Sequence, residues 1–233
     1  MNLYKKLPIN LRNRIHIVFD FIDKLWFLIL ITKNIRIFAL KRKVIHENIV
    51  KIRVGESRQF DGWISTNNRL FSRYYLDLTN QKLPNECIDY IIADNVIEHL
   101  TKHDGEIALR QCFNLLKPSG KLRIATPNAR EICLAYLNND EIKLSEFRSV
   151  MTNHNLEANH FLDLIHNSFQ EFGHEFGYPY DFEYLRFLLE KIGFQNIYMF
   201  ETGCSFDANF LGVESRSSKT ELWSQLCVEA RKP

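Results

Sequence analysis

The histidines of this sequence could bind a metal ion or move protons. His99 and His103 stand four residues apart and could share one face of a helix, whereas His160 and His166, six apart, could do so only with a distortion. A zinc site needs three or four ligands, and no third ligand stands at a suitable spacing from either pair. The sequence therefore predicts no metal site.

Two other kinds of catalytic centre are excluded by motif. The sequence has no Gly-x-Ser-x-Gly turn for a serine nucleophile and no Walker-type loop for a nucleotide phosphate. No secretory signal is visible. The cysteines favour reduced thiols in a cytoplasmic protein over a disulfide framework, because they lie far apart with no Cys-x-x-Cys pair. They are Cys87, Cys112, Cys133, Cys204 and Cys227.

Residues 48–233 form the body of the chain, in which short β-rich runs alternate with helical patterns. Helices are predicted at 104–116, which the run Lys117-Pro118-Ser119-Gly120 stops, and at 181–192, which Gly193 closes. The order of elements predicts an α/β fold, a doubly wound Rossmann-like sheet of about seven strands with helices on both faces. An irregular segment of about 128–180 is predicted to be a lid-like insertion. The expected strands are 49–54, 63–66, 74–78, 88–93, 122–125, 194–200 and 222–230.

Two polar residues directly follow the predicted strand 88–93. They are Asp94 and Asn95. Ligands of such sheets bind at the carboxyl ends of the parallel strands, beside the point where the strand order reverses. Asp94 and Asn95 are therefore expected to face the binding crevice, with Glu98 and His99 shortly after them.

Two segments carry a resemblance to a known family. They are Asp89-Tyr-Ile-Ile-Ala-Asp94-Asn95-Val-Ile-Glu98-His99-Leu100 and Leu116-Lys-Pro-Ser-Gly-Lys-Leu-Arg-Ile-Ala-Thr-Pro-Asn128. They resemble the fourth and fifth strands of class I S-adenosylmethionine-dependent methyltransferases. With Gly62-Trp63-Ile64 shortly after the first predicted strand, the sequence is most similar to a small bacterial branch common among surface-polysaccharide genes. The resemblance covers roughly residues 49–233.

The resemblance implies S-adenosylmethionine as the cofactor and assigns residues to it. Gly55 stands where the family's backbone approaches the methionine part of the cofactor, and Glu56 brings a negative charge there, where a second glycine is usual. Asn67 replaces the usual acid for the ribose hydroxyls, while Asp77 fits the acid that takes the adenine amino group. The implied cofactor set is Gly55, Glu56, Asn67, Asp77, Leu78, Asp94 and Asn95.

The resemblance also implies the activity, methyl transfer to a small polar acceptor, which we expect to be a sugar hydroxyl of a cell-surface glycan or its precursor. A hydroxyl acceptor needs a general base, and histidine suits neutral pH. His99 is the first candidate, and His160 and His174 of the predicted lid are the next. The departures at Glu56 and Asn67 leave an alternative, a catalytically silent methyltransferase-like module that serves assembly or membrane docking.

Residues 1–47 form a basic, apolar extension outside the resemblance. Residues 1–53 carry twelve basic and three acidic side chains, a net charge of +9, whereas the other 180 residues carry −7. Apolar residues recur at helical spacing from 15 to 29, but the uncharged run 25–31 is far shorter than the roughly 20 residues that span a bilayer. The extension is expected to dock on the body, to form a homodimer, or to lie in the membrane interface. We expect a cytoplasmic protein, free or at the inner face of the membrane, and no nucleic-acid partner.

Overall fold

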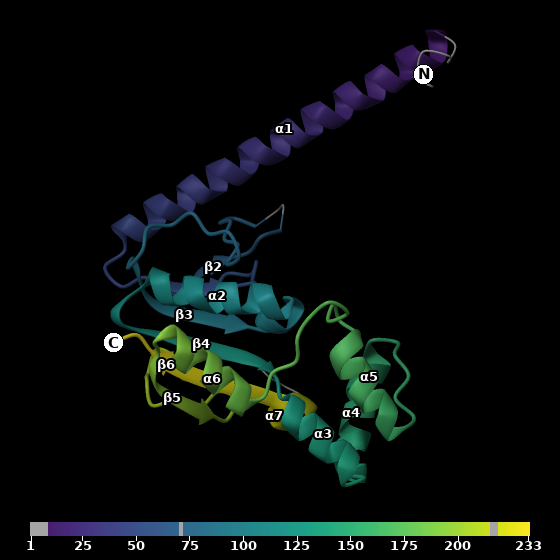
Figure 1. Cartoon of the computed structure of the whole chain (residues 1–233), viewed down its shortest axis with the longest axis vertical. Coiled ribbons are helices and arrows are strands. Elements are labelled where there is room, and N and C mark those ends of the chain that lie inside the picture. Colours follow the sequence, from purple (N-terminus) through teal and green to yellow (C-terminus); the bar gives the residue numbers. More distant parts are fainter. Residues whose placement is uncertain (1–8, 70–71, 215–218) are drawn as a thin grey trace.

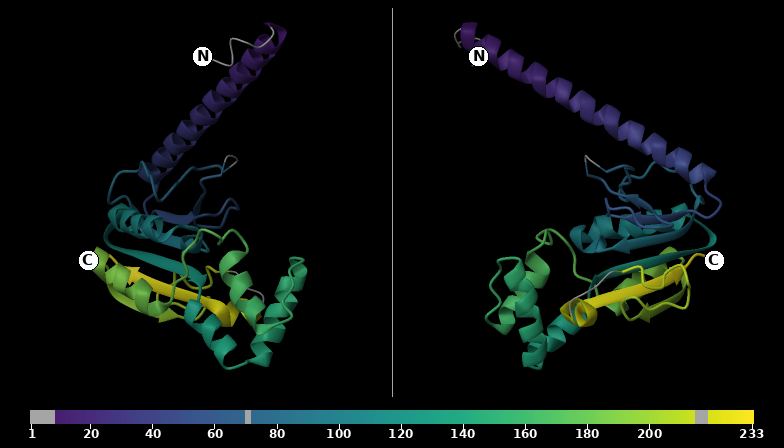
Figure 2. Two further views of the ribbon diagram at one scale, coloured as in Figure 1. Left: turned by 45° about the vertical axis from the view of Figure 1, so that its right-hand side comes forward. Right: turned by 180° about the vertical axis from the view of Figure 1, so that it is seen from behind.

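The computed structural model describes residues 9–69, 72–214 and 219–233. It opens with helix α1, Ile9–His46, which confirms the predicted helical extension. Most of this long helix projects away from the rest of the chain, as all three views show (Figures 1 and 2). Its last turns are anchored, because Leu40 and Val44 are buried in the main apolar core and Arg36 donates a 2.7 Å bond to the carbonyl of Arg69.

A mixed six-stranded sheet forms the centre of the body, and it confirms the predicted Rossmann-like α/β fold. The strand order is β2-β1-β3-β4-β6-β5; β1 to β4 run parallel, and β6 is antiparallel to both of its neighbours. The chain leaves β1 to form β2 on one side and returns to form β3 on the other. The strands are β1 Lys51–Val54, β2 Ile64–Thr66, β3 Ile88–Asp94, β4 Leu116–Pro127, β5 Gln195–Phe200 and β6 Gln225–Arg231.

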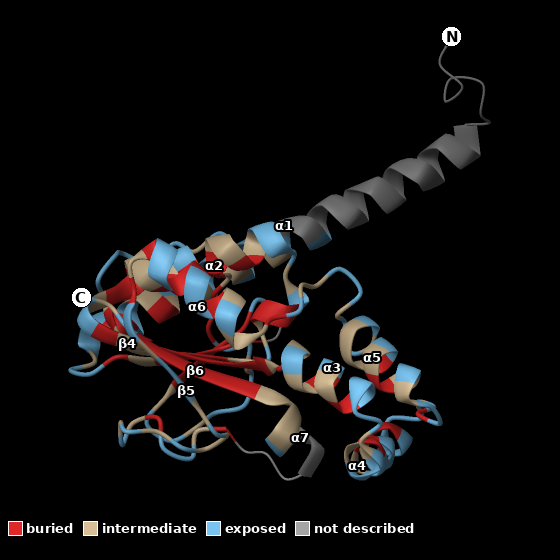
Figure 3. Cartoon of the chain, turned by 60° about the horizontal axis from the view of Figure 1, so that its bottom comes forward, coloured by how far each residue is buried: buried red, intermediate tan, exposed pale blue. Residues whose placement is uncertain are grey.

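Helices α2 (Lys102–Leu115) and α6 (Phe182–Ile192) pack on one face of the sheet, beside the end of α1. Local signals fix their ends. Thr101 accepts a hydrogen bond from the backbone of Asp104 at the start of α2, and Asp181 caps α6 in the same way. Gly193 ends α6 with φ of +117°, a left-handed conformation that glycine adopts without strain. The buried residues of the main core lie on the central strands and on the sides of these helices that pack on them (Figure 3).

The segment predicted as an insertion folds into three helices at the carboxyl ends of the parallel strands (Figure 1). They are α3 Ala129–Leu137, α4 Glu141–Asn153 and α5 Phe161–Gln170, and the short helix α7, Lys219–Ser224, packs beside them. They share a small apolar core of their own, which is separate from the main core. It contains Ile132, Ala135, Leu144, Phe147, Met151, Ala158 and Leu164.

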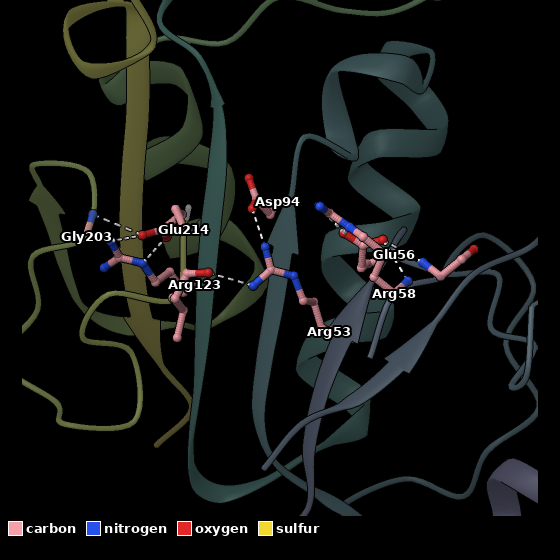
Figure 4. Close-up of polar contacts among 9 residues, drawn as sticks. Arg53, Glu56, Arg58, Asp94, Arg123, Gly203 and Glu214 are labelled. Atoms are coloured by element: carbon pink, nitrogen blue, oxygen red, sulfur yellow. Dashed lines mark hydrogen bonds and ion pairs between the residues drawn. The ribbon is translucent and has the colours of Figure 1, made fainter. Parts of the chain in front are cut away.

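The loop 201–214 covers the other face of the sheet, where it packs on charged side chains that the strands bury. Phe210 is fully buried and stacks with Trp63. Arg123 of β4 donates to the carboxylates of Glu214 and Glu229, and its Nη1 also donates to the carbonyl oxygen of Cys204 at 2.9 Å. Figure 4 shows how this cluster ties the loop to the sheet.

Two strand predictions are wrong. Residues 74–78 are not a strand; they meet the sheet through one isolated bridge, between Tyr75 and Asn67. The strand β2 ends at Thr66, and Asn67 directly after it makes the bridge: its N–H donates to the carbonyl of Tyr74 and its carbonyl accepts from the N–H of Leu76. The second error lies at 222–230, where helix α7 occupies the first residues and the strand begins at Gln225.

Candidate functional site

The chain turns sharply at Gly55 directly after β1. Its φ is +80°, and a Cβ built there would lie 2.6 Å from Cγ2 of Val96, which is too close for any side chain. The next residue is held by a bond from the N–H of Glu56 to the carbonyl of Thr66 at 3.0 Å. Glycine is therefore required here by both the backbone conformation and the space.

The carboxylate of Glu56 folds back onto its own loop. It accepts hydrogen bonds from the N–H groups of Ser57 and Arg58 at 2.8 and 2.9 Å, and it pairs with the guanidinium of Arg58 at 3.0 Å (Figure 4). Partial burial acts to raise the pKa of Glu56, but the bonds from Arg58 outweigh it and the pKa lies below the ordinary value. Arg58 thus offsets the negative charge that the sequence introduces at this turn.

Asn67 links the loops that follow β1 and β2. Its Nδ2 donates to the carbonyl of Gly55 at 2.8 Å, and its Oδ1 accepts from the N–H of Arg69 at 3.1 Å. Asp77 forms a local turn, because its Oδ1 accepts from both the N–H and the hydroxyl of Thr79. Leu78 beside it is buried. The side-chain amide of Asn67 therefore positions the Gly55 turn.

Asp94 and Asn95 stand at the carboxyl end of β3, as predicted for the crevice. Asp94 accepts a 2.6 Å bond from Nη2 of Arg53, whose Nη1 donates to the carbonyl of Val213 (Figure 4). Both side chains of the pair are at most 8% exposed. The reasoning from sequence missed Arg53, although a charged residue inside the apolar run of β1 is a signal for a buried partner.

A pocket of about 290 Å³ opens beside Asn95, between β3 and the helices of the insertion. Glu98 and His99 reach it from the short 3-10 helix η2, Ile97–His99, and His174 reaches it from the loop before α6. The rings of His99 and His174 lie 4.7 Å apart, centroid to centroid. Phe147 and Met151 of α4 supply apolar wall, so the pocket combines polar groups with an apolar surface.

Hydrogen bonds orient the polar groups of this pocket. Nδ1 of His99 bonds the carbonyl of Gly173 at 3.2 Å, and Nδ1 of His174 bonds the carbonyl of Ser168 at 2.8 Å. The hydroxyl of Thr126 donates to the buried carboxylate of Glu98 at 3.1 Å. Burial lowers the pKa of His174, so its neutral form is favoured.

The structure brings two of the three candidate bases together and separates the third. His99 and His174 line the same pocket, whereas His160 is exposed at the start of α5, where its N–H donates to Asp163. His103, the sequence neighbour of His99 at helical spacing, lies exposed on α2. The histidine that lies beside His99 in the pocket is therefore His174, which is distant from it in sequence.

Comparison with known proteins places a family match over this region. Residues 47–124 match the family described as “Methyltransferase domain”. This match supports a methyltransferase. S-adenosylmethionine is accordingly the indicated cofactor. The matched segment runs from the end of α1 into β4 and includes Gly55, Asn67, Asp77 and His99.

Solved methyltransferase structures are similar to the chain at low sequence identity, and no curated protein matches it. A possible histamine N-methyltransferase from Thermotoga maritima is 15% identical with a TM-score of 0.47, and the alignment covers 94% of this chain and 99% of that one. A methyltransferase from Archaeoglobus fulgidus is 14% identical, with a TM-score of 0.45 and coverage of 86% and 94%. The CurJ carbon methyltransferase is 15% identical at a TM-score of 0.46; 79% of this chain spans 48% of that one, about half its length.

Polar groups that S-adenosylmethionine could use lie around the Gly55 turn and the ends of β2 and β3. Gly55 forms a turn without a side chain, where a Cβ would have no room. Asn95 follows the end of β3 with a side-chain amide, and Arg58 pairs with the carboxylate of Glu56 next to the Gly55 turn. Residues that would hold the cofactor are thus present around the ends of β1, β2 and β3.

Proposed function

We propose that the chain transfers a methyl group to the hydroxyl of a small polar acceptor, a sugar of a cell-surface glycan or of its precursor. One observation carries the proposal: His99 and His174 line a pocket of about 290 Å³ that also contains Asn95, at the end of β3. That volume suits a small acceptor. When bound, S-adenosylmethionine supplies an electrophilic methyl carbon.

The contribution of the chain is to align the acceptor, exclude water and accept a proton. Alignment alone can supply about 7–11 kcal/mol of barrier reduction when the reacting groups are held rigidly. The insertion, residues 128–180, would act as a lid whose Phe147 and Met151 keep water from the pocket. Since Nδ1 of both His99 and His174 is bonded to a carbonyl, Nε2 of one of them is the nitrogen that would receive the acceptor proton.

Cofactor binding tests the proposal directly. We expect full-length protein to bind S-adenosylhomocysteine in a calorimetric titration, and the variant Gly55→Ala to bind it at least about 10-fold more weakly, because the new methyl group displaces Val96 and the turn. Gly212→Ala is the matched control. Gly212 also has a positive φ, of +68°, but a Cβ there meets nothing within 4 Å.

Comparing Gly55→Ala with Gly212→Ala distinguishes a loss of affinity caused by backbone strain from one caused by steric blocking of the cofactor site. Both lose the ease with which glycine adopts positive φ, so both are expected to lose some stability, and only Gly55→Ala should lose affinity. If the wild-type protein gives no heat and no thermal shift with millimolar S-adenosylhomocysteine, the proposed methyltransferase activity is wrong. That result would favour the silent module, since the side-chain amide of Asn67 is already bonded to Gly55 and Arg69.

For the extension, we propose peripheral binding to an anionic membrane surface. Leu28, Leu30 and Phe38 of α1 each expose more than half of their surface, and Lys41, Arg42 and Lys43 follow on the same helix. Helices that expose apolar side chains next to basic residues can bind such surfaces by apolar insertion and by attraction to lipid head groups. None of the helices in the described ranges is both long and apolar enough to span a bilayer. The acidic body makes a nucleic-acid acceptor a poor fit.

Vesicle co-sedimentation checks this placement. We expect the protein to pellet with vesicles that contain anionic phospholipid, less so as salt rises, and not with neutral vesicles. The double variant Leu28→Asp/Leu30→Asp should lose most of this binding, while Leu137→Asp, at an exposed apolar residue of α3, should keep it. Equal pelleting of all three proteins, or a lipid-independent dimer disrupted by the double variant, would overturn the proposal.

A further inference from the structure

Glu98, His99 and His174 form a compact cluster of possible metal ligands. One ligand atom of each residue lies within 4.8 Å of the corresponding atoms of the other two. The first two residues come from η2, directly after β3, and the third comes from the loop that joins α5 to α6. The fold thus supplies the third ligand that the spacing of histidines in the sequence could not reveal.

The hydrogen bonds around the cluster resemble those around metal-ligating histidines. A carbonyl oxygen can only accept, so Nδ1 of His99 donates to Gly173 and Nδ1 of His174 donates to Ser168. Each neutral imidazole therefore keeps its lone pair on Nε2. Histidines that bind metals usually donate their other ring nitrogen to a carbonyl or carboxylate in this way, which fixes the tautomer and the ring.

The carboxylate of the cluster is also fixed. Glu98 is 4% exposed, and Thr126 of β4 donates to its Oε2 at 3.1 Å. A nearby cation would lower the cost of burying this negative charge. Two imidazoles and one carboxylate are the protein ligands of catalytic zinc sites and of related transition-metal sites, which keep a further position open.

We propose that Glu98, His99 and His174 bind one divalent transition-metal ion of the zinc type in this pocket. All three residues line the pocket that the proposed function assigns to the acceptor, so an ion held by them would be within reach of the acceptor, and to that extent the inference rests on the proposed function. It narrows the acceptor to one whose hydroxyl oxygen can ligate the ion. Ion binding itself does not depend on methyl transfer.

A bound ion changes the fate of the acceptor proton. Coordination lowers the pKa of a hydroxyl, so the proton passes to solvent while its bonding electron pair stays on oxygen. An oxygen lone pair then forms the bond to the methyl carbon, and the electrons of the broken carbon–sulfur bond remain on sulfur. In this state His99 and His174 hold the ion, and in the metal-free protein one of them would hold the proton.

Metal titration of the full-length protein tests the site. After treatment with a chelator and its removal, we expect the protein to bind one equivalent of Zn²⁺ in competition with a chromophoric chelator. His99→Ala and His174→Ala should each weaken the affinity at least about 100-fold. His160→Ala is the matched control, and His154→Ala tests an exposed histidine that lines the same pocket outside the cluster. Both controls should bind as the wild type does.

Cobalt provides a readout that does not depend on folding of the variants. Co²⁺ bound to the wild-type protein should show visible bands of nitrogen and oxygen ligation; a strong thiolate band would instead place the ion on the exposed Cys133 or Cys204 and overturn the proposal. So would Zn²⁺ binding that is no weaker in the His99 and His174 variants than in the controls. Zinc binding without S-adenosylhomocysteine binding would contradict the proposed function alone, and the reverse result would contradict the metal site alone.

Discussion

Replacing Arg123 with methionine is expected to lower the free energy of unfolding by about 3–5 kcal/mol. Arg123 is fully buried in β4, where it donates to the carboxylates of Glu214 and Glu229. Burial acts to lower the pKa of Arg123, but the bonds to Glu214 outweigh it and the pKa is raised, so the guanidinium stays charged. Methionine fills much of the volume yet leaves two carboxylates without their shared cation. Urea unfolding measures the loss.

The control for this prediction is an arginine that also pairs with a glutamate but is exposed to solvent. Arg110 of α2 is half exposed and lies 3.9 Å from Glu106, and its replacement by methionine should leave stability nearly unchanged. The double variant Arg123→Met/Glu214→Leu should be more stable than Arg123→Met, because one stranded charge is gone. A loss below about 1 kcal/mol for Arg123→Met would show that water reaches the cluster.

The Arg123 cluster has a consequence for the site as well as for stability. The loop 201–214 also accepts a 2.7 Å bond from Arg53 at Val213, and Arg53 in turn donates to Asp94 at the end of β3. If the loop becomes mobile at Glu214, Arg53 loses a fixed partner, and the position of Asp94, a predicted cofactor residue, becomes less well defined. Limited proteolysis of Arg123→Met is expected to cut within this loop first.

The sequence predicted the helices whose apolar spacing and end signals lie within the helix itself. The helices now seen as α2 and α6 were predicted because apolar side chains recur at helical spacing and stop signals follow, Pro118 and Gly120 for α2 and Gly193 for α6. The segment 74–78 has the alternation of a strand, since Tyr74, Leu76 and Leu78 are buried. Among the described residues it forms one isolated bridge, at Asn67, beyond the end of the three-residue strand β2. The length of a neighbouring strand cannot be predicted from the segment itself.

In the candidate site, too, the features set by neighbouring residues could be predicted, and the contacts between distant residues could not. The resemblance to methyltransferases implied the turn at Gly55, and the structure gives that glycine a φ of +80°. The partner of Glu56 was within reach of prediction, since Arg58 is two residues away. The meeting of His99 with His174 depends on where the insertion returns to the sheet. Spacing within one helix pointed instead to His103, which the fold directs elsewhere. Contacts between distant segments needed the structure.

Replacing His99 or His174 with alanine is expected to lower kcat for methyl transfer by about 10²–10⁴-fold, the usual contribution of a group that accepts a proton. The affinity for S-adenosylhomocysteine should stay within about 3-fold of the wild type, because neither imidazole belongs to the Gly55 turn or to the loops that Asn67 joins. Transfer of a labelled methyl group to a panel of sugar glycosides and nucleotide sugars measures kcat.

His160→Ala is the matched control for this loss. His160 is exposed at the start of α5, outside the pocket, so its replacement should leave kcat unchanged. The double variant His99→Ala/His174→Ala should lose little more than the worse single variant if the two imidazoles act on one proton or one ion, because residues that act as a unit are far from additive. Two losses that multiply would mean that the histidines work independently, and the shared role inferred from their 4.7 Å separation would then be wrong.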